Sequence, residues 1–251
     1  AQNYFLGRWE APLPTARACN ARCLGCISEQ DDPGLPASHD RIAFEPTPEE
    51  IAEVALTHAA RAKKPVVSFG QGCEGEPILR ADLLEAAIRL IRARDPNLTI
   101  NLNSNASRPL ATRALFAAGL SSLRVSLNSV RAAPYDAYFR PRGYSFDDVL
   151  ASIDEAKAAR GFVSLNYFTF PGFTDREEEV AALDALIKRT DLDMIQWRNL
   201  NIDPDSYIAT MPAAEGALLG LPAMLAHLRR SFPALRHGYF NPYVPGDAPA
   251  T

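Results

Sequence analysis

Cysteine and histidine are scarce in this sequence, with four residues of each among 251. Four cysteines are too few for a disulfide-stabilised scaffold in a chain of this length. Three of them, Cys19, Cys23 and Cys26, nevertheless lie within eight residues. Such clustering in a cysteine-poor chain indicates a metal or cluster site in a reducing compartment, and we therefore expect a cytoplasmic protein.

Long hydrophobic runs and an excess of one charge are also missing. No stretch of about 18 apolar residues occurs, so no transmembrane helix is expected. The first residues, AQNYFLGRWE, lack the basic and apolar regions of a signal peptide. The formal net charge is -4, so bulk charge does not indicate nucleic acid as a partner.

Short β-type runs alternate with longer helical patterns along most of the chain. Helices are expected to start at caps such as Thr47-Pro48-Glu49-Glu50, Ser145-Phe146-Asp147-Asp148 and Thr174-Asp175-Arg176-Glu177. This alternation predicts βαβ units with parallel strands and outer helices. Six units are fewer than the eight of a closed barrel, so we expect an α/β fold forming a partial, TIM-like (β/α)6 barrel. The six strands are expected near residues 14–18, 65–69, 98–102, 123–127, 162–170 and 194–197.

The pattern also predicts how the chain divides. Residues 1–12 are expected to be an N-terminal segment, and residues 13–205 the barrel core. Residues 206–251 are expected to supply a helix near Leu218–Arg230 and a proline-rich tail that together cap the open side of the barrel.

Polar and glycine-rich residues follow the ends of the predicted strands. Sites in parallel α/β sheets form beyond the carboxyl ends of the strands, so these residues are site candidates. They are the three cysteines after the first strand, Gly75, Glu76 and Pro77 after the second, Ser104 and Asn105 after the third, Ser126 and Asn128 at the end of the fourth, Pro171 and Gly172 after the fifth, and Arg198 at the end of the sixth.

The cysteines have C-x3-C-x2-C spacing, which suits a cubane iron–sulfur cluster. Three thiolates on one short loop can hold three corners and leave the fourth iron open for a small molecule. Two alternatives stay open. A zinc-binding structural or interaction module would use His39 as the fourth ligand, and a simple iron–sulfur electron carrier would use a fourth protein ligand such as Cys73.

With this motif after its first strand, the sequence resembles the radical SAM superfamily. The resemblance implies a [4Fe–4S] cluster on Cys19, Cys23 and Cys26, whose open iron binds S-adenosylmethionine (SAM). It implies reductive cleavage of SAM to methionine and a 5′-deoxyadenosyl radical, which abstracts hydrogen from a substrate. It also implies a reductant such as flavodoxin or ferredoxin.

Further elements extend the resemblance and assign the SAM contacts. Glu74-Gly75-Glu76-Pro77 resembles the family's GGEP element, which meets the SAM amino group. Ser104-Asn105-Ala106 lies where many members carry Thr-Asn-Gly, and LRVSLNS resembles an element whose serine, here Ser126, binds the SAM carboxylate or ribose. Asn128, Ser164 and Asn166 are assigned as further polar contacts. Two departures are Glu74 in place of glycine, and Gly25 where members usually carry an aromatic that packs near adenine; we expect adenine to contact backbone and the sixth strand instead.

The substrate is less well indicated. Cys73 and Arg198 are the candidates for contact with it, as a thiol at a strand end and as a partner for a carboxylate. A packing role for Cys73 and a structural ion pair for Arg198 stay open. The sequence has no cysteine after Cys73, so we expect no auxiliary cluster domain in this chain. A peptide or protein segment entering through the open side and a small molecule are both compatible with a partial barrel.

Overall fold

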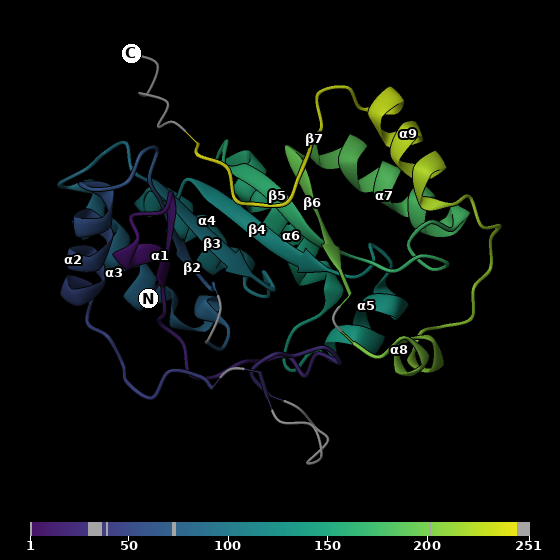
Figure 1. Cartoon of the computed structure of the whole chain (residues 1–251), viewed down its shortest axis with the longest axis horizontal. Coiled ribbons are helices and arrows are strands. Elements are labelled where there is room, and N and C mark those ends of the chain that lie inside the picture. Colours follow the sequence, from purple (N-terminus) through teal and green to yellow (C-terminus); the bar gives the residue numbers. More distant parts are fainter. Residues whose placement is uncertain (1, 30–36, 39, 72–73, 201, 245–251) are drawn as a thin grey trace.

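Seven parallel strands form one sheet whose spatial order is the chain order (Figure 1). The computed structural model describes residues 2–29, 37–38, 40–71, 74–200 and 202–244. The strands are β1 (Glu10–Leu13), β2 (Val66–Phe69), β3 (Thr99–Ser104), β4 (Ser122–Leu127), β5 (Phe162–Thr169), β6 (Met194–Asn199) and β7 (Arg236–Gly238). The α/β partial barrel predicted from the sequence is confirmed, and β1 and β7 are its two unjoined edges.

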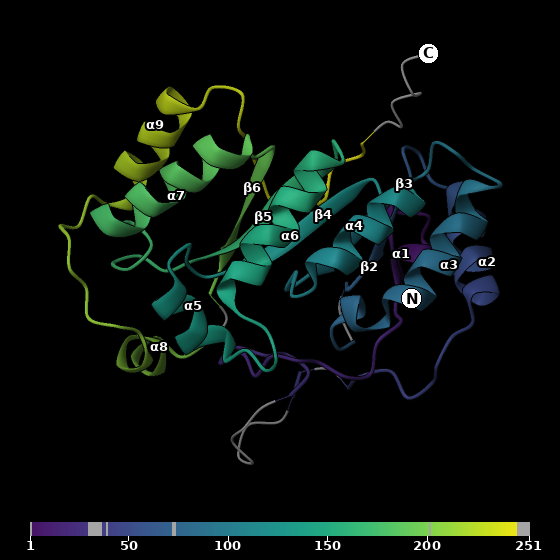
Figure 2. The ribbon, with the colours of Figure 1, turned by 180° about the vertical axis from the view of Figure 1, so that it is seen from behind.

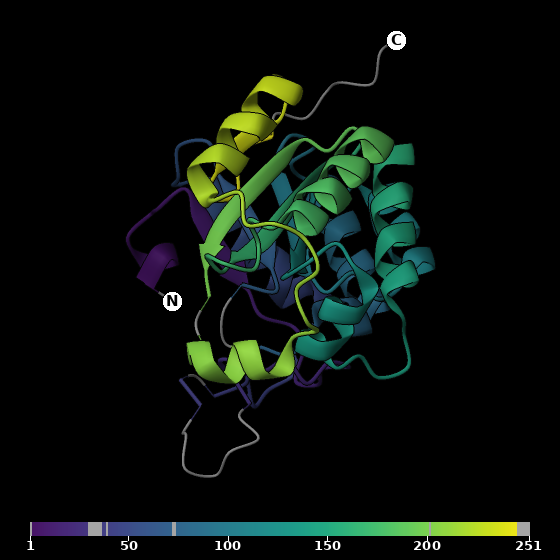
Figure 3. The same cartoon turned by 90° about the vertical axis from the view of Figure 1, so that its right-hand side faces the viewer.

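Helices cover one face of this sheet. Figure 2 shows α2, α3, α4, α6 and α7 side by side over the outer face, with α9 beside α7. Figure 3 shows α8 apart from that layer. The helices are α1 (Gln2–Phe5), α2 (Pro48–Ala59), a 3-10 turn η1 (Pro77–Arg80), α3 (Ala81–Arg92), α4 (Pro109–Ala118), α5 (Ala132–Phe139), α6 (Phe146–Ala158), α7 (Glu177–Thr190), α8 (Pro204–Thr210) and α9 (Leu221–Ser231).

The two faces of the sheet differ sharply in polarity. Alternate strand residues are apolar and pack under the helices, among them Val67, Leu102, Val125, Leu165 and Ile195. The residues between them are polar and form the inner face of the barrel. This inner face consists of Ser68, Asn101, Asn103, Ser122, Arg124, Ser126, Ser164, Asn166, Gln196 and Arg198. A polar inner face favours a bound ligand, because a purely structural core would be apolar.

The chain after β7 crosses the inner face and connects strands that are not neighbours. The Asn241 amide donates to Glu10 Oε1 at 2.7 Å and to Asn103 Oδ1 at 3.1 Å. Its Oδ1 accepts from Gln196 Nε2 at 2.9 Å. Asn241 therefore ties β1, β3 and β6 together across the open barrel, and this segment is visible in yellow in Figure 1.

Three element boundaries differ from the sequence prediction. The first strand ends at Leu13, because the amides of Thr15 and Ala16 donate to Glu74 instead of to a neighbouring strand. Helix α7 starts after Arg176, because the side chains of Thr174 and Asp175 accept from earlier backbone amides and form a turn. The sheet also gains a seventh strand, β7, from residues beyond 205, all of which were expected to belong to the cap.

The helix starts at Thr47 and Ser145 are confirmed. Both residues cap with their side chains, and both form the reciprocal capping box with the third residue of the helix. No helix within the described ranges is long and apolar enough to cross a membrane.

Candidate active site

The loop that carries the three cysteines follows β1 and is held by backbone pairing. Arg22 N donates to Phe139 O at 2.9 Å, and Leu24 N donates to Tyr138 O at 3.0 Å. Ala21 forms an isolated antiparallel bridge with Pro141. The end of α5 and the residues after it therefore fix the conformation of the cysteine loop.

Asn20 connects the same loop to the residues after β3. Its Nδ2 donates to Ser107 Oγ at 2.9 Å, and its Oδ1 accepts from Asn105 Nδ2 at 2.8 Å. Asn105 in turn donates its backbone amide to Glu76 Oε2 at 2.8 Å. The cysteine loop, the β3 loop and the Glu76 segment are thus joined by direct hydrogen bonds.

The segment after β2 lies against the cysteine loop so closely that it requires glycine. Gly75 N donates to Ala16 O and Glu76 N to Ala18 O, both at 2.8 Å. A Cβ atom built on Gly75 would lie 2.0 Å from Ala18 O. Any side chain at this position would push the two segments apart. Glycine is therefore required here, because only glycine lets the two backbones approach this closely.

The carboxylate of Glu76 is the buried acid at the centre of the site, with only 6% of the residue exposed. It accepts from Ser104 Oγ at 2.6 Å, Asn105 N at 2.8 Å and Ile78 N at 3.1 Å. Burial nevertheless outweighs these hydrogen bonds and raises the pKa of Glu76 to about 7. A bound cation beside it would favour the ionised form.

Two adjoining cavities bring the cysteines and Glu76 together. They have volumes of about 260 and 290 Å³ and share several walls, so they form one hollow. The shared lining is Cys19, Cys23, Ile27, Gly75, Ser126, Phe139 and Asn166. Glu76, Pro77, Ser104, Asn105 and Arg124 line the smaller cavity, and Gly25, Cys26, Tyr138 and Phe168 line the larger one.

The three thiols fit a cluster better than a single metal ion. Burial raises the pKa of Cys19 to about 11, and the charges of Glu76 and then Cys26 add to the rise. Burial also raises the pKa of Cys23 well above its ordinary value, with repulsion from Cys19 and Cys26 adding to it. Bound iron would offset that cost. Among the described residues no three His, Cys, Asp or Glu side chains are placed to share one ion, whereas each thiolate on a cubane takes a different iron. His39, the fourth ligand of the zinc alternative, lies outside the described residues.

The structure brings most of the sequence-derived candidates together. Gly75, Glu76, Pro77, Ser104, Asn105, Ser126 and Asn166 all line the smaller cavity with Cys19 and Cys23. Ser164 lies outside both linings and accepts from Gln196 Nε2 at 3.3 Å. Arg198 also lies outside them but donates to Asn166 Oδ1 at 3.1 Å. Cys73 falls outside the described residues.

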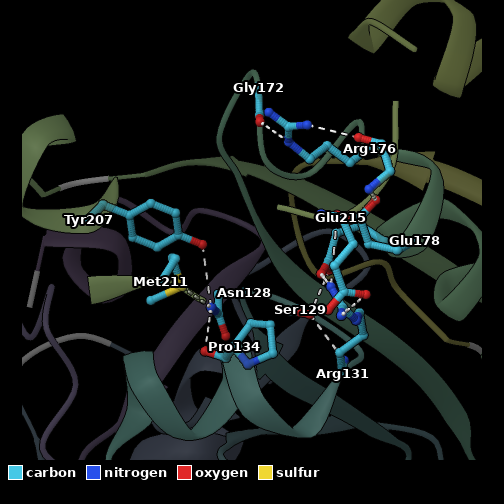
Figure 4. Close-up of polar contacts among 12 residues, drawn as sticks. Asn128, Ser129, Arg131, Pro134, Gly172, Arg176, Glu178, Tyr207, Met211 and Glu215 are labelled. Atoms are coloured by element: carbon cyan, nitrogen blue, oxygen red, sulfur yellow. Dashed lines mark hydrogen bonds and ion pairs between the residues drawn. The ribbon is translucent and has the colours of Figure 1, made fainter. Parts of the chain in front are cut away.

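Asn128 does not share the direction of Ser126. Figure 4 shows its amide turned toward α5 and α8, where it donates to Pro134 O at 3.0 Å and contacts Tyr207 and Met211. The strand ends at Leu127, so the alternation of side-chain direction no longer applies one residue later. Asn128 therefore anchors α8 and does not line the cavities.

Sequence reasoning missed several groups at the site. Phe139, Tyr138 and Phe168 form an aromatic wall near the cysteines. Their signal in the sequence was two aromatic runs, one around Tyr138 and one around Phe168, which fit a core equally well. No residue of β6 lines either cavity, although adenine was expected to contact the sixth strand. Arg124 was also missed, although its alternation with Ser126 along β4 predicts the same face.

The fold is an open parallel α/β barrel, with three cysteines after its first strand and a buried glutamate after its second. Together these features define a class of cofactor-dependent enzymes. A family model described as the radical SAM superfamily matches residues 13–183, which is more than half of the chain. The chain belongs to this superfamily, and its cofactors are a [4Fe–4S] cluster and SAM.

Curated relatives are similar over about half of their own length. GTP 3′,8-cyclase of Thermodesulfovibrio yellowstonii is 30% identical over 169 residues, which are 66% of this chain and 48% of the relative. GTP 3′,8-cyclase 1 of Pseudomonas aeruginosa is 33% identical over 181 residues, covering 70% and 50%. The chain thus spans about half the length of the curated relatives it matches.

Among solved structures, SuiB of Streptococcus suis bound to S-adenosylmethionine has a TM-score of 0.59. It is 14% identical, and the match covers 93% of this chain and 51% of SuiB. The structure of SuiB bound to its precursor peptide SuiA matches similarly, with a TM-score of 0.58 and 14% identity over 92% of this chain and 48% of SuiB. At this identity the likeness shows the fold alone.

Proposed function

We propose that this chain cleaves SAM reductively and uses the resulting radical to abstract hydrogen from a substrate. The observation that carries the proposal is the shared hollow, in which Cys19, Cys23 and Cys26 lie beside the Glu76 carboxylate. When bound, a reduced [4Fe–4S] cluster supplies the electron that breaks SAM into methionine and a 5′-deoxyadenosyl radical.

The protein residues have separate tasks in this proposal. Cys19, Cys23 and Cys26 hold the cluster. The carboxylate of Glu76, held by Ser104 Oγ and Asn105 N, faces the amino group of SAM and orients it. The close contact at Gly75 keeps that carboxylate next to the cysteine loop.

The rest of SAM is assigned to groups that line the same hollow. Ser126 and Asn166 are hydrogen-bonded to each other at 3.3 Å and offer polar contacts to the carboxylate or ribose. Ile27 and Phe139 offer the apolar surface on which adenine packs. They take the role of the aromatic residue that family members usually carry at the position of Gly25. Ser164 supports this set through Gln196 rather than by contact.

The substrate and the reductant belong to the proposal as classes. A peptide segment or a small molecule would reach the hollow from the open side of the barrel. SuiB was solved with a precursor peptide, and the curated relatives are GTP 3′,8-cyclases, so neighbours of this chain exist for both classes. The electron donor is proposed to be a small redox protein such as flavodoxin or ferredoxin.

The test is anaerobic reconstitution with iron and sulfide, followed by incubation with dithionite and SAM. We expect about four iron and four sulfide per chain, a change in the EPR spectrum of the reduced cluster when SAM is added, and formation of 5′-deoxyadenosine. Zinc without sulfide would support the structural module instead, and a cluster whose spectrum ignores SAM would support the electron carrier.

Cysteine substitutions assign the ligands. Cys19→Ala, Cys23→Ala and Cys26→Ala should each abolish the cluster absorbance and 5′-deoxyadenosine formation, since each thiolate holds one iron. Cys73→Ala is the matched control and should keep the cluster. Loss of the cluster in Cys73→Ala, with retention in one of the other three, would disprove the assignment.

A further inference from the structure

Two arginines project from the inner face of the barrel beside the shared hollow that is lined by the cysteines and Glu76. Arg124 on β4 is in register with Asn103 on β3 and Ser164 on β5, and it lines the smaller cavity. Arg198 on β6 donates to Asn166, which lines both cavities. The two guanidinium groups therefore approach the hollow from either side of β5.

Neither guanidinium forms an ion pair within the described part of the chain. Arg124 Nη1 contacts only the neutral Gln196 Oε1 at 3.4 Å, and its Nε is enclosed with no hydrogen-bond partner among the described residues. Arg198 donates to a neutral amide, and its guanidinium carbon lies 4.0 Å from the centre of the Tyr239 ring. Other arginines, such as Arg113 and Arg131, are paired with carboxylates.

Glu10, the acid whose charge acts on Arg124, already accepts hydrogen bonds from other residues. Glu10 accepts from Ser68 Oγ at 2.6 Å and from Asn241 Nδ2 at 2.7 Å, so its carboxylate is directed toward β2 and the segment after β7. Burial and the charge of Arg198 lower the pKa of Arg124 to about 10, with Glu10 opposing weakly. Arg124 therefore stays charged at neutral pH, and two like charges share one polar region of the inner face.

Both arginines are half-buried, and the Arg124 Nε atom is enclosed without a hydrogen-bond partner among the described residues. Partly desolvated cations without a carboxylate partner are costly, and an anion between them would reduce that cost. We propose that Arg124 and Arg198 together bind a carboxylate or phosphate group of the substrate on the inner face of the barrel. The proposal rests on the proposed function, because it assigns the substrate class of the same site. The anion would hold the substrate against the wall formed by Ser126 and Asn166, next to the place assigned to SAM.

The test measures anion binding directly and needs no turnover. The purified chain is titrated at constant ionic strength with inorganic phosphate and, separately, with succinate, while the thermal unfolding midpoint is followed. We expect saturable stabilisation by at least one probe, and the tighter probe distinguishes phosphate from carboxylate recognition. Arg198→Gln and Arg124→Gln should weaken binding about tenfold or more, and Arg198→Lys should weaken it less because one charge remains.

Arg113→Gln is the matched control, because Arg113 lies on the outer helix α4 and pairs with Glu155. It should bind the probes like the unaltered chain. Absence of saturable stabilisation by both probes would overturn the proposal, as would unchanged binding in both Arg124→Gln and Arg198→Gln. Arg124 carries an Nε atom enclosed in the fold, so the Arg198 variants decide the matter if Arg124→Gln fails to fold.

Measuring SAM binding distinguishes a site for the substrate anion from a site for the SAM carboxylate. If Arg198→Gln weakens SAM binding as much as anion binding, the pair serves the SAM carboxylate and the proposal is overturned. A loss at least tenfold larger for the anion than for SAM supports it. Arginine-dependent anion binding in a chain that forms no 5′-deoxyadenosine would leave this site standing while overturning the proposed function.

Discussion

Glu74 stands where the family's motif has glycine, and its carboxylate holds the loops around the cysteines. It accepts from Thr15 N at 2.7 Å, Ala16 N at 2.8 Å, Gly70 N at 2.6 Å and Thr15 Oγ1 at 3.1 Å. Burial raises its pKa despite these four donors. The residue that weakens the motif match therefore makes the connection between the ends of β1 and β2.

Replacing Glu74 should destabilise the protein strongly. In Glu74→Gln an amide group would face backbone N–H donors, leaving at least one of them without an acceptor. We expect a loss of about 2–4 kcal/mol in the free energy of unfolding, measured by urea denaturation. Glu85→Gln is the control, because Glu85 forms an exposed pair with Arg89 on α3 and should cost less than about 0.5 kcal/mol. Equal effects of the two changes would contradict this role.

Glu76 should make the cluster-free protein less stable as the pH rises. Its pKa is raised from 4.5 to about 7 in the folded state, so the folded protein holds this proton more tightly than the unfolded chain. Stability contributed by the proton is complete below pH 4.5 and is lost as the pH rises to about 7. The expected loss is on the order of 3 kcal/mol.

The measurement compares urea denaturation of the unaltered protein and Glu76→Gln across that interval. Other carboxyl groups titrate in both proteins, so the difference between the two curves isolates Glu76. The curves should diverge, with the unaltered protein losing more stability toward pH 7. Parallel curves would mean that the folded protein does not retain the Glu76 proton.

Residues at the strand ends also mark where sequence reasoning stops. Ser126 and Asn166 were assigned from the resemblance, and both line the hollow because they lie inside β4 and β5, where side chains alternate. Asn128 was placed on the face of Ser126 because it comes two residues later, but it lies one residue past the end of β4, where the chain has already turned toward α8. Side chains alternate in direction only while the backbone is extended and paired in the sheet.

Elements with strong local signals were predicted, and elements that depend on their surroundings were not. Helices α2 and α6 have capping boxes that operate without the rest of the fold. Helix α5 has Pro134 inside it and no side-chain cap at Arg131, so its local signal is weak. Strand β7 has three residues and exists because β6 offers it an edge. The shortest elements are therefore set by tertiary contacts.

The end of α6 permits a test of backbone conformation. Arg160 is exposed and follows the helix with a φ of 58°, in the left-handed region that favours glycine. Arg160→Gly should stabilise the protein by about 1 kcal/mol, because it relieves the contact of Cβ with the backbone. Ala158→Gly, at the exposed last residue of the same helix, should destabilise it by less than about 1 kcal/mol. Thermal unfolding of the two variants would refute the interpretation if both changed stability in the same direction.

At the scale of the whole molecule, the strands of the open barrel are connected by contacts that could not be predicted from the sequence. The segment from Asn241 onward reads as a proline-rich tail, yet Asn241 contacts Glu10, which is 231 residues away. Thr99, at the start of β3, exchanges hydrogen bonds with the backbone of Val244. No local pattern encodes a pairing between the two ends of the chain, because its energy comes from polar groups that only the folded sheet brings together.

Asn241 should therefore stabilise the molecule well beyond its own segment. Asn241→Ala removes hydrogen bonds to three strands and leaves the buried Glu10 carboxylate with Ser68 alone. We expect a loss of about 2–4 kcal/mol in unfolding free energy, because one lost bond involves a charged group. Hydrogen exchange should accelerate most in β1, β6 and β7, the strands at and next to the two edges. Asn97→Ala, at an exposed asparagine before β3, is the matched control and should change neither quantity by much. If exchange in Asn241→Ala rose only after residue 238, the segment would be a passive tail and the edges of the barrel would be stable without it.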